Sequence, residues 1–496
     1  MRNSSILFAT FILALAGPAA AQEEQADQES EELQDTSLDA PPPSFDLEES
    51  IADGPALSAA DAATRAVDTS PTLARARALS QASEFGVARA RSQMLPRLDL
   101  SAMYAHIDGF EDGSIPLPVN EEAIAVQREL ASRITDPASQ ALWNLQIEGQ
   151  AAGNAVTVPM PRDRVDFGVR LSWPVSDFFF AILPAVDAAE AGARAREYEI
   201  AVTTAGVRRS AYEAYYTLAR ARGAHGVAVE AEEQAKARLE EVEAATRAGL
   251  LTESDRLAVV SRVAEAAQAI AAATSGVEIA DAALRTLIGA DDGAVFGVAL
   301  AEETPVDADY AMALDRRPEL QALREVVTAQ RGAAQVAYAG GYPHLRVRAG
   351  ANYANPNQYQ VPPTQNWEPS WEVGASLTWS PNDTLTSVHH GDQLSSEVGA
   401  TEAQIENMRR MIQLEVRRAQ AELRAAERGL EAAEASVTAA STAYESRRAQ
   451  LRAGGTTTAE LFDNERQLNR ARLVQLDAHV LVQLANVHLA YSVGAL

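Results

Sequence analysis

The feature that most constrains this chain is an internal duplication, with the same landmarks at nearly equal spacing in both halves. Trp173 lies 76 positions before Gly249, and Trp379 lies 75 positions before Gly454. From each of these two glycines, another glycine follows 40 positions later. The two halves therefore derive from one repeated unit. A length of 496 residues would otherwise suggest about three domains.

Each copy contains a short turn between two long, alanine-rich helical patterns. The turns are Arg247–Asp255 and Arg452–Glu460. In both, an Arg-X-Gly sequence allows a helix to end on a left-handed glycine, with the arginine near the negative end of the helix dipole. Thr252 with Asp255, and Thr457 with Glu460, have the Thr-X-X-acid spacing of a capping box. We therefore expect each turn to be the tip of a helical hairpin.

A very long helix is expected before each tip. About 67 residues separate the strand region from the tip in each half, and as helix they would extend about 100 Å. The second copy has an apolar residue at every seventh position and alanines three positions further on. The apolar positions are Val416, Leu423, Leu430, Val437, Tyr444 and Leu451, and the alanines are Ala419, Ala426, Ala433 and Ala440. This pattern predicts a coiled-coil seam.

Upstream of the long helices the hydrophobic period changes to two residues, which predicts four strands. Their apolar positions are Leu98 to Tyr104, Phe167 to Trp173, Leu345 to Tyr353 and Trp371 to Trp379, each taken at alternate residues. The opposite face carries Arg97, Asp166, Arg170, Arg346, Arg348 and Glu372. Such strands are typical of an outer-membrane barrel with a water-filled lumen. An antiparallel sheet on a soluble core remains the alternative.

The remaining segments have simpler patterns. Residues 59–94 are expected to be helical with a break near Pro71, and part of the long 105–165 connection, residues 120–134, resembles a short amphipathic helix. Residues 1–21 resemble a cleaved secretory signal, and the acidic lead 22–56 is expected to be disordered. The first repeat then covers 57–289, a linker 290–306 and the second repeat 307–496. No later run reaches the ~18 apolar residues of a membrane helix, so strands are the expected span.

Composition excludes several classes of function. The net charge is −27 and there is no basic tract, so nucleic acid is not an expected partner. Cysteine is absent, which excludes disulfides, thiolate metal sites and a lipid-anchored cysteine. The seven histidines have no metal-ligand spacing, His389-His390 is interpreted as a solvated pair, and no nucleophile elbow or phosphate loop is present. We therefore expect no enzyme, no cofactor and no metal site.

In this order and spacing, the segments resemble the TolC family of outer-membrane efflux proteins. The most specific marks are the two tips, Leu95-Pro96 before a strand that ends at Tyr104, and the matching Tyr342-Pro343 before Tyr353. The resemblance covers residues ~57–496. It implies an α+β membrane protein in which three protomers each give four strands to one transmembrane β-barrel and their helices to a long coiled-coil barrel. It also implies a periplasmic adaptor, an inner-membrane transporter, and a place in the outer membrane of a Gram-negative bacterium.

The resemblance also suggests roles for individual residues at the tips. The expected adaptor-docking residues are Arg247, Gly249, Leu250, Thr252, Gly454 and Thr456. Termination and capping of the helices would explain the glycines and threonines without any partner. Exposure of an apolar Leu250 is harder to explain in that way.

An acidic entrance ring is the second expected site, with Asp255, Glu460 and Asp463 as its residues. Glu460 and Asp463 stand one turn apart on one helix face, whereas the first copy has Asp255 and Ala258. By resemblance they match acidic positions at the family's periplasmic entrance. Two unit charges about 8 Å apart repel by roughly 2 kcal/mol at an effective dielectric near 20, so a threefold ring favours cations. A solvated acidic helix face is the alternative.

Two tryptophans and the overall function complete the expectations. Trp173 and Trp379 end matching strands and are expected at the periplasmic membrane interface, with simple core tryptophans as the alternative. The expected function is a duct that passively conducts substrates delivered by a pump. A periplasmic coiled-coil scaffold is the alternative. Drug, metal ion, metabolite and polypeptide all remain open as cargo.

Overall fold

The structure is a computed structural model of the chain. It describes residues 57–109, 113–116, 118–153, 155–158, 161–249, 251–291, 296–299, 309–360, 365–453 and 455–496. The predicted signal segment and acidic lead lie outside these residues, as do Leu250, Gly454 and most of the predicted linker. Two compact units are present, and each draws on both sequence repeats. The sheet unit contains residues 63–210, 304–423 and 485–496, and the tip unit contains 211–303 and 424–484 together with the chain up to residue 62.

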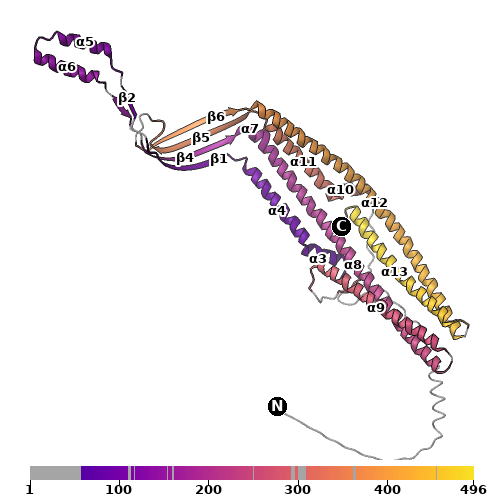
Figure 1. Ribbon diagram of the computed structural model, residues 1–496. Helices are drawn as coiled ribbons and strands as arrows, with labels where there is room; N and C mark the ends of the chain where they lie inside the picture. Colours follow the sequence, from indigo (N-terminus) through magenta and orange to yellow (C-terminus); the bar gives the residue numbers. More distant parts are fainter. Residues whose placement is uncertain are drawn as a thin grey trace, which may run out of the picture. The chain divides into compact units, whose positions relative to one another are not determined.

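The sheet unit contains the four predicted strands in one antiparallel sheet, in the order β1-β4-β5-β6 (Figure 1). Their bounds are β1 Arg97–His106, β4 Asp163–Pro174, β5 His344–Asn355 and β6 Glu368–Thr378. The four prediction ranges fall on these strands, except that Trp379 follows the last residue of β6. The alternation of apolar and polar side chains set the register, because a slip of one residue would exchange the two faces.

One face of this sheet is apolar and exposed. Leu100, Val169, Val373 and Trp371 lie on it, and Trp371 is 80% exposed. Large apolar side chains in this number normally have a covering layer. In the described chain no layer covers them, so the structure contradicts the alternative in which this sheet lies on a soluble core of its own chain.

The β1–β4 connection contains more structure than the sequence predicted. The expected amphipathic helix is α5 Glu121–Ser132, and it pairs with a second helix, α6 Pro137–Ala151 (Figure 1). Each helix begins with a side-chain cap, from Asn120 and Asp136 respectively. A short two-stranded ribbon, β2 Gly113–Pro116 and β3 Ala155–Val158, connects to this hairpin. The sequence analysis missed α6 because its apolar residues do not gather on one face.

The helices of the sheet unit have a buried apolar core. Among them are α4 Pro71–Ser92, α7 Val175–Asp177, the π-turn η1 Phe178–Ile182, α10 Tyr310–Arg316, α11 Pro318–Ala339 and the first parts of α8 Leu183–Arg247 and α12 Pro381–Arg452. Leu320 and Val327 of α11 pack against Val398, Ile405 and Ile412 of α12. These positions are spaced by seven residues along both helices, which is the spacing of a coiled-coil seam. The predicted break near Pro71 is confirmed, because α3 Ala59–Thr69 ends just before it.

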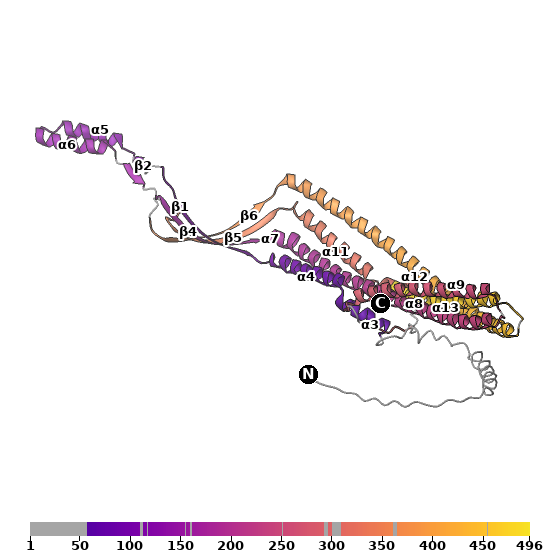
Figure 2. The ribbon, with the colours of Figure 1, turned by 60° about the horizontal axis from the view of Figure 1, so that its bottom comes forward.

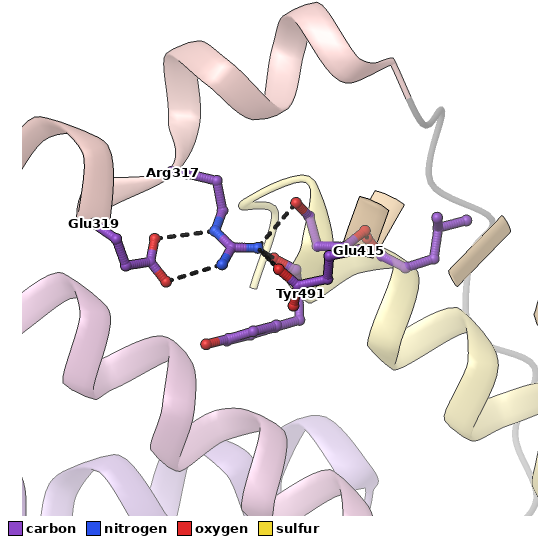
Figure 3. A network of polar contacts seen from close by, with 6 residues as sticks. Arg317, Glu319, Glu415 and Tyr491 are labelled. Carbon is purple, nitrogen blue, oxygen red and sulfur yellow. Dashed lines mark hydrogen bonds and ion pairs between the residues drawn. The ribbon is translucent and has the colours of Figure 1, made fainter. Parts of the chain in front are cut away.

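A buried arginine ties the last residues of the chain to this core (Figure 3). The side chain of Arg317 is 6% exposed. Its guanidinium donates to both carboxylate oxygens of Glu319, at 3.0 and 3.2 Å, and to Glu415 at 2.9 Å. It also donates to the carbonyl of Ser492 at 3.1 Å, and it lies over the ring of Tyr491. Every side of the charge therefore has an acceptor, as burial requires.

Arg317→Ala is expected to destabilise the protein by about 3–5 kcal/mol, because it leaves two carboxylates and a helix-end carbonyl without their donor. Thermal unfolding followed by circular dichroism measures the effect. The matched control is Arg331→Ala on the same helix, whose ion pair with Glu402 is exposed and is worth at most about 1 kcal/mol. Equal melting temperatures for the two variants would contradict the role given to Arg317.

The tip unit is a bundle of helical hairpins (Figure 2). It contains the end of α8 Leu183–Arg247, all of α9 Glu253–Ile288, the end of α12 and most of α13 Thr458–Ser492. The predicted long helices are confirmed: α8 has 65 residues and α12 has 72. The predicted seam of α12 faces inward here, because Ala440 and Tyr444 are buried against Leu461 and Leu468 of α13.

Helix α9 contains an apolar stretch that needs separate description. Its length and composition would allow it to cross a membrane, since one 18-residue window has a mean hydropathy of 1.2. The sequence analysis predicted no such helix after the signal, because no later run reaches the ~18 apolar residues of a membrane helix. Only 6% of the window is buried within the chain. One helix of this kind is weak evidence for a span, but its exposed alanines need a physical explanation.

Candidate functional site

The first tip has the predicted conformation. Helix α8 ends at Arg247, and Gly249 has a φ of 78°, the left-handed conformation in which glycine is not strained. The capping box is complete: the Asp255 backbone N–H donates to the Thr252 hydroxyl at 3.3 Å, and the Thr252 N–H donates to the Asp255 carboxylate at 3.0 Å. The Thr252 hydroxyl also donates to this carboxylate and holds the pKa of Asp255 below its ordinary value. Asp255 is therefore a structural cap.

The second tip is built differently. The Glu460 N–H donates to the Thr457 hydroxyl at 3.3 Å, which is half of the predicted capping box. The Glu460 carboxylate instead accepts from the hydroxyl of Thr456, and Arg447 lies 3.3 Å from the same oxygen. Glu460 therefore joins the two helices of its hairpin.

Asp463 and Glu460 are both exposed, and both have an arginine partner in the protomer. Asp463 forms an ion pair with Arg466, one turn further along α13. Exposed pairs of this kind are weak and exchange readily with solvent ions. The predicted acidic positions are thus accessible, although each is partly neutralised. The sequence analysis did not consider these two arginines, which stand at ordinary helical spacings.

The two tips are joined by one aromatic side chain. Phe462 of α13 is 9% exposed and packs between Val242 of α8 and Val259 of α9. Its equivalent in the first repeat is Leu257, which is 53% exposed. An exposed leucine beside an exposed threonine cap is a surface on which a partner helix could bury apolar area. Sequence reasoning missed Leu257, although the mismatch between the two copies at this position could have indicated it.

The predicted docking residues differ in how much the structure describes. Arg247, Gly249 and Thr252 are exposed around the first turn, and Thr456 is half-buried at the second. Leu250 and Gly454 lie outside the described residues. At the second tip, the chain turn is closed by a hydrogen bond between described residues: the Gly455 N–H donates to the carbonyl of Gln450 at 2.8 Å. The described tip residues are thus brought together within each hairpin, where the hydroxyls of Thr252 and Thr456 bond the acidic residue of their own turn.

The two predicted interface tryptophans have different surroundings. Trp379 is 55% exposed, and its indole N–H donates to the Gly341 carbonyl and the Thr384 hydroxyl, each at 3.2 Å. Trp173 is half-buried and meets Phe178 edge to face. Both lie at the end of the sheet where the helices begin. The exposed side chains of this region include Phe179, Phe180 and Tyr342. Aromatic rings with a polar tip are typical of a membrane–water interface.

Catalytic chemistry has no evident basis in the described residues. Among them, no group of three or more histidine or acidic side chains is arranged to hold a metal ion. The geometry instead offers an apolar sheet face, a polar sheet face and exposed helical tips.

Comparison with known proteins agrees with this geometry. Residues 310–495 match the family model described as outer membrane efflux protein. No curated protein sequence matches the chain. Among solved structures, the outer-membrane channel OprN has a TM-score of 0.69 at 18% identity, covering 92% of this chain and 97% of that one. The Campylobacter jejuni CmeC channel has a TM-score of 0.68 at 15% identity, with 88% and 85% covered.

The open Neisseria gonorrhoeae MtrE channel has a TM-score of 0.66 at 16% identity, with 88% of each chain covered. At these identities the structures show a shared fold, and the family model identifies the second repeat as an outer membrane efflux protein domain. The expected resemblance to the TolC family is confirmed. The OprN, CmeC and MtrE structures are each described as an outer-membrane channel.

Proposed function

We propose that three copies of this chain form a duct in the outer membrane of a Gram-negative bacterium. The observation that carries the proposal is the four-stranded sheet with a bare apolar face. In the described chain, β1 and β6 are its two outer strands, so each has an edge without a partner. Neither an open edge nor unpaired backbone groups are tolerated in lipid. Joining β6 of one copy to β1 of the next closes a barrel with the apolar face outward.

The helices support the same assembly. The exposed alanine-rich surface of α9 suits close packing against a neighbouring copy, because small side chains let helices approach. Three copies of α8, α9, α12 and α13 would then form a periplasmic coiled-coil tunnel. This explains the apolar window of α9 without a membrane span.

Transport through this duct would need partners at the other end. We propose that the tips dock a periplasmic adaptor and that an inner-membrane transporter delivers the cargo. The support is the exposed tip surface around Gly249, Thr252 and Leu257. The predicted signal segment agrees with export from the cytoplasm. In this proposal the pump makes the first choice among drug, metal ion, metabolite and polypeptide cargo.

Purification from membranes tests the proposal. We expect the mature protein in the outer-membrane fraction, as a trimer in mild detergent, with ion conductance when it is added to a planar bilayer. A periplasmic scaffold, the alternative function, would be extracted without detergent and would give no conductance. A detergent-solubilised monomer that keeps its strand signal would also contradict the proposal, because closure of the barrel needs the other copies.

A further inference from the structure

The polar face of the sheet has an uneven distribution of charge. Its pairing register arranges the side chains in rows across the four strands. One row contains Asp99, Arg170 and Glu372. Two more rows follow toward the end of the sheet where α4, α7, α11 and α12 join the strands. The first contains Arg97 and Arg348, and the second contains Arg346. The charged side chains of these two rows are therefore all basic.

Three of these arginines have no carboxylate partner among the described residues. Arg97 is bound to Asp99 at 2.9 Å, two residues along its own strand. Arg170, Arg346 and Arg348 are exposed on this face and form no ion pair within the described chain. Like charges at this spacing repel one another unless an anion lies between them. A cluster of unpaired arginines is unexpected in a chain whose net charge is −27.

The three arginines line one hollow of about 940 Å³ in the sheet unit. Polar and charged side chains share the lining, among them Gln93, Ser172 and Glu372. A Cβ added at Gly374 would meet the Arg348 Nε at 3.5 Å, and one added at Gly350 would meet the Glu372 Cγ at 3.4 Å, so both glycines lie directly beside these charged side chains. The three guanidinium groups are exposed and line the hollow.

We propose that Arg170, Arg346 and Arg348 form an anion-binding belt, which favours cargo with phosphate or carboxylate groups. This inference rests on the proposed duct, because only a closed barrel turns the polar face into a lumen. Three copies would place nine unpaired guanidinium groups within three neighbouring rows of the barrel wall. Guanidinium binds oxyanions through paired, charge-assisted hydrogen bonds. The belt lies at the end of the barrel where the helices join the strands, and cargo from the periplasmic tunnel would enter there.

Block of single-channel current by tripolyphosphate tests the belt. The full-length trimer is placed in a planar bilayer at 0.1 M KCl, where charges are screened beyond about 10 Å. Tripolyphosphate added on the barrel side is expected to reduce the current, whereas the uncharged sugar raffinose is not. The triple variant Arg170→Gln, Arg346→Gln and Arg348→Gln should raise the half-blocking concentration about ten-fold or more.

Single variants provide the matched comparison. Arg348→Gln should weaken the block several-fold, whereas Arg97→Gln, on the same face but already neutralised by Asp99, should change it by less than about two-fold. Glu372→Gln removes a competing carboxylate and should strengthen the block, which keeps the test informative if the triple variant does not assemble. A conducting channel whose block is the same in all variants overturns the belt alone. Failure of the native protein to conduct overturns the proposed duct, and the belt with it.

Discussion

Replacing Glu460 and Asp463 together by alanine is expected to remove the cation preference of the channel. In the proposed trimer these residues place six carboxylates around one constriction. Two such charges about 8 Å apart interact by roughly 2 kcal/mol, and a trivalent cation would bridge several of them. The half-blocking concentration of hexamminecobalt(III), added on the tip side of a planar bilayer, should therefore rise about ten-fold or more. The ratio of cation to anion permeability should fall toward one.

The ion pairs of the second tip make this prediction sharper. Arg466 partly neutralises Asp463, so Arg466→Gln is expected to act in the opposite direction and strengthen the block. The control is the double variant Glu431→Ala and Glu445→Ala, which removes the same charge from exposed positions of α12. If the native block persists after loss of Glu460 and Asp463, or if the control loses as much block, these residues are only a solvated helix face.

Leu257→Asp at the first tip is expected to abolish pump-dependent efflux while the trimer and its conductance persist. The exposed leucine would be buried by a docked adaptor helix, and a charge placed in that contact is unpaired. Leu250→Asp, which the sequence alone singled out, should have the same effect. Efflux in cells that depend on this duct, and co-purification of the adaptor after crosslinking, are the measurements.

The matched control for this prediction is Leu142→Asp in α6. This variant makes the same substitution at a leucine that is more exposed than Leu257. Leu142 lies in the helical hairpin that follows β1, far along the chain from either tip. Normal efflux from both Leu257→Asp and Leu250→Asp would rule out docking at the first tip. Loss of the trimer in the tip variants would show that Leu257 packs between protomers instead.

Periodic elements could be predicted from the sequence because their signal is local. The alternation along Leu98 to Tyr104 requires two faces on a strand, whichever neighbour pairs with it. The spacing of Thr252 and Asp255 gives a capping box wherever that helix lies. The equal 40-residue spacing after the tips was also informative, because Gly289 and Gly494 both have left-handed φ values, 63° and 73°.

Long-range partners could not be predicted, because nothing in the local pattern specifies them. Arg317 donates to the carboxylate of Glu415, which is 98 positions away in the sequence, and to the carbonyl of Ser492, which is 175 positions away. The second tip departs from the capping box because Arg447, on the other helix of its hairpin, competes for the Glu460 carboxylate. Sequence spacing alone could not show that contact.

The sequence by itself determined the duplication, the strands, the long helices and the position of both tips, since each follows from residue periodicity within one segment. Only the tertiary structure decided which equivalent residues of the two repeats differ in environment. Phe462 is buried between the hairpins, whereas its counterpart Leu257 is left at the surface. Two copies of one sequence pattern cannot both occupy the same place in a three-dimensional core, so packing had to make them unequal.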